Sequence, residues 1–139
     1  MMSNSMSAKV QWLDGMKFVA TSGTGHSVVM DGNREGHAPT PMEMVLMAAG
    51  SCSSVDVVSI LEKTRQQFVR CEVELEGKRA DSVPAVFTDI HMHFKVYGKG
   101  VAEQHVERAV KLSADKYCSV SIMLGASVNV THSFEVIEA

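Results

Sequence analysis

Two periods of hydrophobic and polar positions run along this chain of 139 residues. A period of two, typical of β-strands, occurs near both ends and in the middle, and helical patterns occur between these segments. The predicted strands cover residues 8–13, 17–22, 26–31, 68–77, 85–98 and 127–138, and the predicted helices cover residues 41–64, 102–117 and 118–125. Strands, a helix, two strands, helices and a strand, in this order, predict an α+β fold rather than a parallel α/β fold.

The longest predicted helix begins with a clear start signal. Thr40 is a good N-cap, Pro41 suits the first helical position, and Glu43 completes a T-x-x-E capping box. The residues that follow are apolar on most faces as far as Leu61, which predicts a central and buried helix. Glu43 is interpreted as a helix cap and is kept as a candidate supporting residue of a site.

A thiol and a carboxylate lie one turn apart in the middle of this apolar helix. Cys52 and Asp56 share a face, and the small residues around Cys52 let another backbone or a ligand come close. Burying a carboxylate is costly unless a cation or hydrogen-bond donors meet it. We therefore expect polar partners on the face of Cys52, which favours a functional site over a plain packed core.

The reactivity of Cys52 depends on what lies beside it. The thiolate is the nucleophile, and a nearby cation lowers the thiol pKa from its usual value of about 8.5. Because Cys52 lies in mid-helix, the helix dipole contributes little, and the cation has to come from elsewhere. The candidates are Arg34 and His37 before the helix, His26 among the early strands, and Arg65 at the helix end; the sequence does not rank them.

The two other cysteines have plainer explanations. Cys71 occupies an apolar position on a regular strand and is interpreted as a buried core thiol. Cys118, at the end of the second predicted helix, also fits a core position. It gains weight as a partner of Cys52 only if the fold brings the two residues together.

His91 and His93 form an H-x-H pattern on one face of a predicted strand. Such a pair can chelate zinc or copper. Asp89 and Lys95 share the same face, however, while the apolar residues take the other face. The pattern therefore favours a solvated strand face, and no metal or cofactor is predicted.

Composition narrows the class of protein. The net charge of −3 and the scattered basic residues argue against a nucleic-acid partner. We expect no membrane partner, since no apolar run is expected to reach the roughly 20 residues of a span, and we see no secretory signal. Three cysteines fit a reducing cytoplasm better than a disulfide framework. One domain over residues 1–139 is expected, with residues 1–7 as a frayed tail.

Two motifs resemble the OsmC/Ohr family of thiol-dependent peroxidases. The first is P-x-x-x-x-x-x-A-A-G-x-C, from Pro41 to Cys52, and the second is C-S-V-S, from Cys118 to Ser121. The order of strands and helices agrees with that family over nearly the whole chain. Residues 30–66 look most like its YhfA-like branch.

This resemblance implies an intertwined homodimer, in which antiparallel sheets wrap central long helices and the active sites form at the subunit interface. By position, Cys52 looks like the peroxidatic cysteine and Cys118 like the resolving cysteine. The implied activity is the reduction of hydroperoxides, organic ones in particular, with a dithiol reductant that reopens the disulfide. Without such activity, the same fold would fit a redox sensor, a protein that binds a small apolar ligand, or a plain dimeric scaffold.

The chain departs from the hydroperoxide-specific members at two places. Those members have a Glu directly after the helix-start proline. At that position this chain has Met42, and Glu43 follows one residue later. They also have an arginine in the early hairpin, where this chain offers His26. In the family, this Glu and this arginine are the pair that activates the reactive thiolate. In this chain, the candidate substitute for the pair is Asp56 together with Arg34 or Arg65.

Overall fold

The chain folds into two compact units, and the computed structural model describes residues 4–139 of it. The first unit ends at Val45, and the second covers Leu46–Ala139. Each unit has its own sheet. The expectation of one domain over the whole chain stays a prediction.

The first unit is a three-stranded antiparallel sheet in the order β1-β2-β3. Its strands are β1 (Ala8–Asp14), β2 (Lys17–Ser22) and β3 (Ser27–Asp31), which confirms the three predicted strands. The turn between β1 and β2 depends on Gly15, whose φ of 54° lies in the left-handed region that glycine adopts without steric cost.

The expected frayed tail over residues 1–7 is tested only in part, because residues 1–3 lie outside the described residues. Ser7, just before β1, is tied to the turn after β2, since its carbonyl accepts a hydrogen bond from the Gly23 N–H at 2.7 Å. This hydrogen bond involves only the last residue of the expected tail, and the frayed tail stays a prediction.

The predicted capping box opens α1 (Pro41–Lys63). The Glu43 N–H donates to Thr40 Oγ1 at 3.2 Å, and the Thr40 N–H donates to Glu43 Oε1 at 2.9 Å. These bonds satisfy two of the N–H groups that a helix start leaves without partners. The backbone bond from Thr40 and then its hydroxyl hold the pKa of the Glu43 carboxyl below the ordinary value, with a smaller contribution from Arg34.

The second unit contains most of α1, a second sheet and the remaining helices. The predicted helix over residues 102–117 ends its α-helical part at Leu112 and continues as a π-helical turn, η1. The elements after α1 are β4 (Phe68–Arg79), β5 (Phe87–Gly98), α2 (Glu103–Leu112), η1 (Ser113–Tyr117), α3 (Ser119–Leu124) and β6 (Asn129–Glu138).

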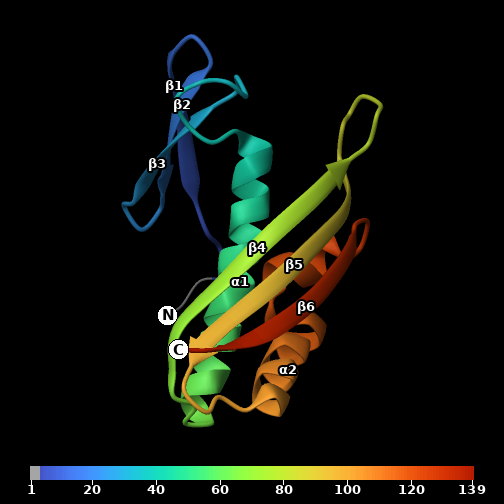
Figure 1. Ribbon diagram of the computed structural model, residues 1–139. Coiled ribbons are helices and arrows are strands. Elements are labelled where there is room, and N and C mark those ends of the chain that lie inside the picture. Colours follow the sequence, from blue (N-terminus) through green and yellow to red (C-terminus); the bar gives the residue numbers. More distant parts are fainter. Residues whose placement is uncertain (1–3) are drawn as a thin grey trace. The chain divides into compact units, whose positions relative to one another are not determined.

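The second sheet has the order β4-β5-β6 and is mixed (Figure 1). β4 and β5 are antiparallel, whereas β5 and β6 are parallel, with Ile90 opposite Val130. The expectation of antiparallel sheets is therefore wrong for this pair. The crossover through α2, η1 and α3 carries the chain back to the end of the sheet at which β5 began, so β6 runs in the same direction.

One face of the second sheet forms the core of this unit. The side chains of Ile90, Met92, Phe94 and Val96 on β5 are fully buried. α1 and α2 lie along this face (Figure 1), and Val57, Leu61 and Val106 are fully buried from the helix side. The alternation of β5 thus sends its apolar residues toward the helices and leaves His91 exposed on the other face.

α1 is buried along one stripe only, formed by Ala49, Gly50, Ser53, Val57 and Leu61. Val55 is 68% exposed and Met47 is 49% exposed. The prediction of a central and buried helix therefore holds for this stripe, and within a single chain it is wrong for the faces that carry Met47 and Val55.

By length and composition alone α1 could cross a membrane, with a mean hydropathy of 1.8. The expectation that no apolar run reaches the length of a membrane span is therefore wrong for α1. Core helices of soluble proteins pass the same test, so this is weak evidence for a membrane protein.

Candidate active site

Cys52 lies in the middle of α1 and is half-buried. Cys118 lies between η1 and α3, where the backbone is extended, and its side chain is fully buried. The Cys118 thiol donates to Ser121 Oγ at 3.2 Å and its sulfur accepts the Ser121 N–H at 3.4 Å, so Cys118 is the N-cap of α3. The sulfur is held in one orientation by these two contacts.

The structure brings the two thiols together. Burial raises the pKa of the Cys118 thiol, the two contacts with Ser121 lower it, and a hydrogen bond and charge interaction with the Cys52 thiol raise it further. Both cysteines are free thiols rather than a disulfide. Cys52 and Cys118 are therefore neighbours in space although 66 positions separate them in the sequence.

Asp56 has the polar partner that its position on α1 requires. The buried Ser113 hydroxyl donates to Asp56 Oδ2 at 3.0 Å, and the Ser53 and Ser113 Oγ atoms are 2.8 Å apart. One arrangement of protons satisfies all three groups, with Ser53 donating to Ser113 and Ser113 donating to Asp56. We call Ser53, Asp56 and Ser113 the serine-aspartate cluster.

Sequence reasoning did not identify Ser113 as a site residue. Its signal was weak: a serine at a position of the second predicted helix that otherwise carries apolar residues. A buried hydroxyl needs a partner, and the Asp56 carboxylate on α1 provides one.

Comparison with known proteins identifies the family. The family model for OsmC-like proteins matches residues 33–133. This chain belongs to the OsmC-like family. Protein YhfA of Escherichia coli strain K12 is 54% identical over 134 residues, which cover 96% of this chain and 100% of YhfA.

Solved structures agree with this assignment. A hypothetical protein from Aquifex aeolicus VF5 has a TM-score of 0.89 and 31% identity over 99% of each chain. An organic hydroperoxide resistance protein OsmC from Legionella pneumophila has a TM-score of 0.72 and 15% identity over 97% of this chain and 99% of its own, a likeness that shows the fold. The family resemblance and the α+β fold class predicted from the sequence are both confirmed.

The candidate cations of this OsmC-like chain are distributed over both units. Arg65 follows the end of α1, thirteen residues after Cys52, which corresponds to about 20 Å of helix rise. It is exposed and has a φ of 58°. Arg65 therefore lies too far along the helix to contact Cys52 of the same chain.

The other candidate cations, Arg34, His37 and His26, belong to the first unit, and their role at Cys52 stays a prediction. His26 takes part in its own turn, where its Nδ1 lies 3.1 Å from Thr24 Oγ1. Arg34 lies close enough to Glu43 to contribute to that residue's lowered pKa.

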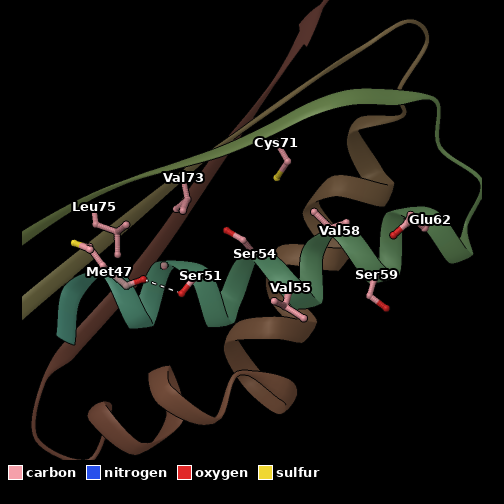
Figure 2. A pocket seen from close by; sticks show the side chains of 11 residues that line it. Met47, Ser51, Ser54, Val55, Val58, Ser59, Glu62, Cys71, Val73 and Leu75 are labelled. Carbon is pink, nitrogen blue, oxygen red and sulfur yellow. Dashed lines mark hydrogen bonds between the residues drawn. The ribbon is translucent and has the colours of Figure 1, made fainter. Parts of the chain in front are cut away.

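An open apolar groove of about 730 Å³ lies between α1 and β4. Figure 2 shows the Cys71 sulfur pointing from β4 toward α1, on the same side as Val73 and Leu75. Cys71 is half-buried rather than in the core as predicted, and burial, followed by the charge of Glu72, raises the pKa of its thiol. The groove is lined by Met47, Gly50, Ser51, Ser54, Val55, Val58, Ser59, Glu62, Cys71, Val73 and Leu75.

A smaller pocket of about 340 Å³ lies beside Asp56, between α1 and the junction of α2 and η1. It combines a carboxylate, a hydroxyl and an ammonium with apolar walls. Tyr117, which directly precedes Cys118, is one of its lining residues, so this pocket lies on the side of α1 where the two thiols meet. Its lining residues are Asp56, Ser59, Ile60, Lys63, Leu112 and Tyr117.

The two histidines of the H-x-H pattern make hydrogen bonds to hydroxyl groups of β6. His91 Nδ1 lies 2.6 Å from Thr131 Oγ1, and Ser133 Oγ lies 2.8 Å from His91 Nε2 and 2.7 Å from His93 Nδ1. His93 Nε2 also lies 3.5 Å from a carboxylate oxygen of Glu135. Across residues 4–139, no group of three or more His, Cys, Asp or Glu side chains is arranged to hold a metal ion.

Proposed function

We propose that this OsmC-like protein is a thiol-dependent peroxidase that reduces organic hydroperoxides, with Cys52 as the peroxidatic cysteine and Cys118 as the resolving cysteine. The observation that carries the proposal is the meeting of two reduced thiols from distant segments, one half-buried and one fully buried. Membership of a family that includes proteins named for organic hydroperoxide resistance supports it.

The proposed cycle begins at Cys52. Its thiolate attacks the hydroxyl oxygen of the hydroperoxide, an S–O bond forms as the O–O bond breaks, and the leaving alkoxide takes a proton from water to become the alcohol. The sulfur loses two electrons and becomes a sulfenic acid. The Cys118 sulfur then attacks the Cys52 sulfur, so that an S–S bond forms and water leaves, and a dithiol reductant restores both thiols by exchange.

The surroundings of the two thiols support this division of roles. Cys118 is fully buried, and this burial is the first cause that raises the pKa of its thiol, so Cys118 is shielded from peroxide. Cys52 is half-buried and open to a small substrate. The pocket beside Asp56, one turn along α1 from Cys52, has apolar walls that suit the organic part of a hydroperoxide.

A second copy of the chain is part of this proposal. Large apolar side chains remain exposed in each unit, which a stable lone chain rarely tolerates over a wide area. A homodimer in the reducing cytoplasm would cover them, and no nucleic-acid or membrane partner is proposed. The exposed apolar residues include Val10, Trp12, Leu13, Met16, Val28, Val29, Met47 and Val55.

One experiment tests the peroxidase. The reduced protein is treated with stoichiometric cumene hydroperoxide or hydrogen peroxide, and thiol loss and intact mass are followed for wild type, Cys52→Ser and Cys118→Ser. We expect a rapid Cys52–Cys118 disulfide in wild type, over-oxidation of Cys52 in Cys118→Ser, and no rapid reaction in Cys52→Ser. Cys71→Ser is the matched control and should react like wild type.

A wild-type rate equal to that of a free thiol, or a rapid reaction that survives Cys52→Ser, would contradict the peroxidase. The apolar groove beside Cys71 favours the alternative function, a redox-sensing or ligand-binding protein of the same fold. That alternative predicts slow thiol oxidation together with saturable binding of a fluorescent fatty acid, which Val55→Lys would abolish.

A further inference from the structure

We propose that Ser113 is a positioning residue that holds Cys118 against Cys52 and thereby sets the rate of disulfide formation between them. The proposal rests on the proposed function for the two cysteine roles. Ser113 acts on the two sulfur atoms indirectly. Its side chain binds α1, and its backbone binds Cys118.

The side chain of Ser113 binds α1 at two positions that follow Cys52 within one turn. Its fully buried hydroxyl binds Asp56 Oδ2 at 3.0 Å, one turn after Cys52, and Ser53 Oγ at 2.8 Å, directly after Cys52. Hydrogen bonds to a carboxylate are among the stronger ones in proteins. The start of η1 is thus fixed to α1 at the position of the peroxidatic thiol.

The backbone of Ser113 holds Cys118. The Cys118 N–H donates to the Ser113 carbonyl at 2.8 Å, and this bond closes the π-helical turn η1. The N–H of Ser113 itself belongs to α2, because it donates to the carbonyls of Ala109 and Val110. One residue therefore joins α2, α1 and the resolving cysteine. π-helical turns are rare in proteins, and those that occur are often found at functional sites.

Cys118 is fixed from its other side as well. Its sulfur caps α3 through the N–H and the hydroxyl of Ser121, so the rotation of its side chain is restricted. With Ser113 on one side and Ser121 on the other, the direction of the Cys118 sulfur is set before any oxidation takes place.

Disulfide formation is sensitive to this kind of placement. The bond requires a narrow range of Cβ separations and dihedral angles. A misplacement of about 1 Å between reacting groups can slow a reaction by about 100-fold. Releasing Ser113 from α1 should therefore slow the condensation step while leaving the first attack of Cys52 on peroxide unchanged.

The test uses Ser113→Ala in the full chain. We expect the rate of Cys52 oxidation by cumene hydroperoxide to stay within about twofold of wild type. The following disulfide formation should be at least about tenfold slower, so that dimedone traps much more sulfenic acid at Cys52. Ser51→Ala is the matched control, because Ser51 lies on α1 next to Cys52 but its hydroxyl binds carbonyls of its own helix.

A pair at Asp56 covers the case in which Ser113→Ala does not fold. Asp56→Asn keeps an oxygen that accepts the Ser113 hydroxyl, and it should retain most of the condensation rate. Asp56→Ala removes that acceptor and should behave like Ser113→Ala. Equal rates in Asp56→Asn and Asp56→Ala, or a wild-type condensation rate in Ser113→Ala, would overturn the positioning role.

A second readout does not depend on peroxide. Equilibration with reduced and oxidised glutathione measures how readily the two thiols form a disulfide. In this exchange, two protein thiols and one glutathione disulfide give the protein disulfide and two molecules of reduced glutathione. Ser113→Ala should lower this equilibrium constant at least about tenfold. If wild type forms no Cys52–Cys118 disulfide with glutathione, the positioning role is overturned. If wild type forms this disulfide but reacts slowly with peroxide, the peroxidase is contradicted and the glutathione readout stays valid for the positioning role.

Discussion

The two sides of α1 carry thiols in opposite surroundings. On the side of η1, Cys52 lies beside Cys118, and the serine-aspartate cluster fixes the two segments to each other. On the side of β4, Cys71 faces an open apolar groove, where burial and a neighbouring carboxylate both disfavour its thiolate. Under the proposed function, the surroundings of a cysteine, rather than its presence, decide which side of the helix carries the redox chemistry.

The largest expected effect on stability separates the buried stripe of α1 from its groove side. Leu61 is fully buried, so Leu61→Ala should lower the free energy of unfolding by about 2–5 kcal/mol, from lost burial and the cavity left behind. Val55 is 68% exposed, and Val55→Ala should change the free energy of unfolding by no more than about 0.5 kcal/mol. Urea unfolding followed by circular dichroism measures both.

This comparison also responds to the second copy of the chain. If Val55 is covered in a homodimer, the cost of Val55→Ala should grow with protein concentration, because dimerisation stabilises the folded state by mass action. Equal costs for the two substitutions at low protein concentration would contradict the one-sided burial of α1.

A smaller effect is expected at the start of α1. Thr40→Ala removes the N-cap hydroxyl and should cost about 1 kcal/mol of unfolding free energy. Glu43→Gln keeps an oxygen that can accept the Thr40 N–H, so the helix start is preserved. Because Glu43 is interpreted as a helix cap, the oxidation rate of Cys52 should stay within about twofold of wild type. A large loss of that rate in Glu43→Gln, measured by thiol loss with cumene hydroperoxide, would mean that Glu43 serves Cys52 rather than the helix end.

The smallest expected effect compares Cys71 and Cys118 in alkali. Burial, as the first cause, raises the pKa of both thiols in the folded chain. The unfolded chain therefore loses these protons at lower pH, and the stability they contribute is present below the ordinary thiol pKa of about 8.5 and is lost as pH rises above it. The urea midpoint of the reduced protein should fall from pH 8 to pH 10.

Cys71→Ala should make this fall shallower. The difference between variant and wild type isolates the thiol from the lysines and tyrosines that titrate in the same range. An identical pH dependence in the two proteins would show that Cys71 is as solvated in the folded chain as in the unfolded chain.

Much of the local structure could be predicted from the sequence, because the signals are local. Alternation located the strands, and the Thr40–Glu43 capping box predicted a helix start that the structure confirms. The parallel direction of β6 could not be predicted, because alternation records which face a residue takes and not the direction of its neighbour strand. The π-helical turn at Ser113 was missed because one added residue hardly changes a helical pattern.

The candidate site shows the same division. The cost of burying a carboxylate predicted that Asp56 has a polar partner, and the structure supplies Ser113. The meeting of Cys52 with Cys118 depends on long-range contacts, and before the structure only the family resemblance indicated it. The partial exposure of α1 could not be predicted, since composition does not say whether an apolar face meets the same chain or another one.

The parallel pairing of β5 and β6 has a consequence for the order of events during folding. Antiparallel β4 and β5 can pair as a hairpin from neighbouring segments, whereas β6 reaches its place only after the whole crossover has closed. Cys118 lies within that crossover, so we expect the thiol pair to assemble late. A nascent or partly folded chain would then carry these cysteines apart from each other, and the thiol pair would exist only once folding is complete.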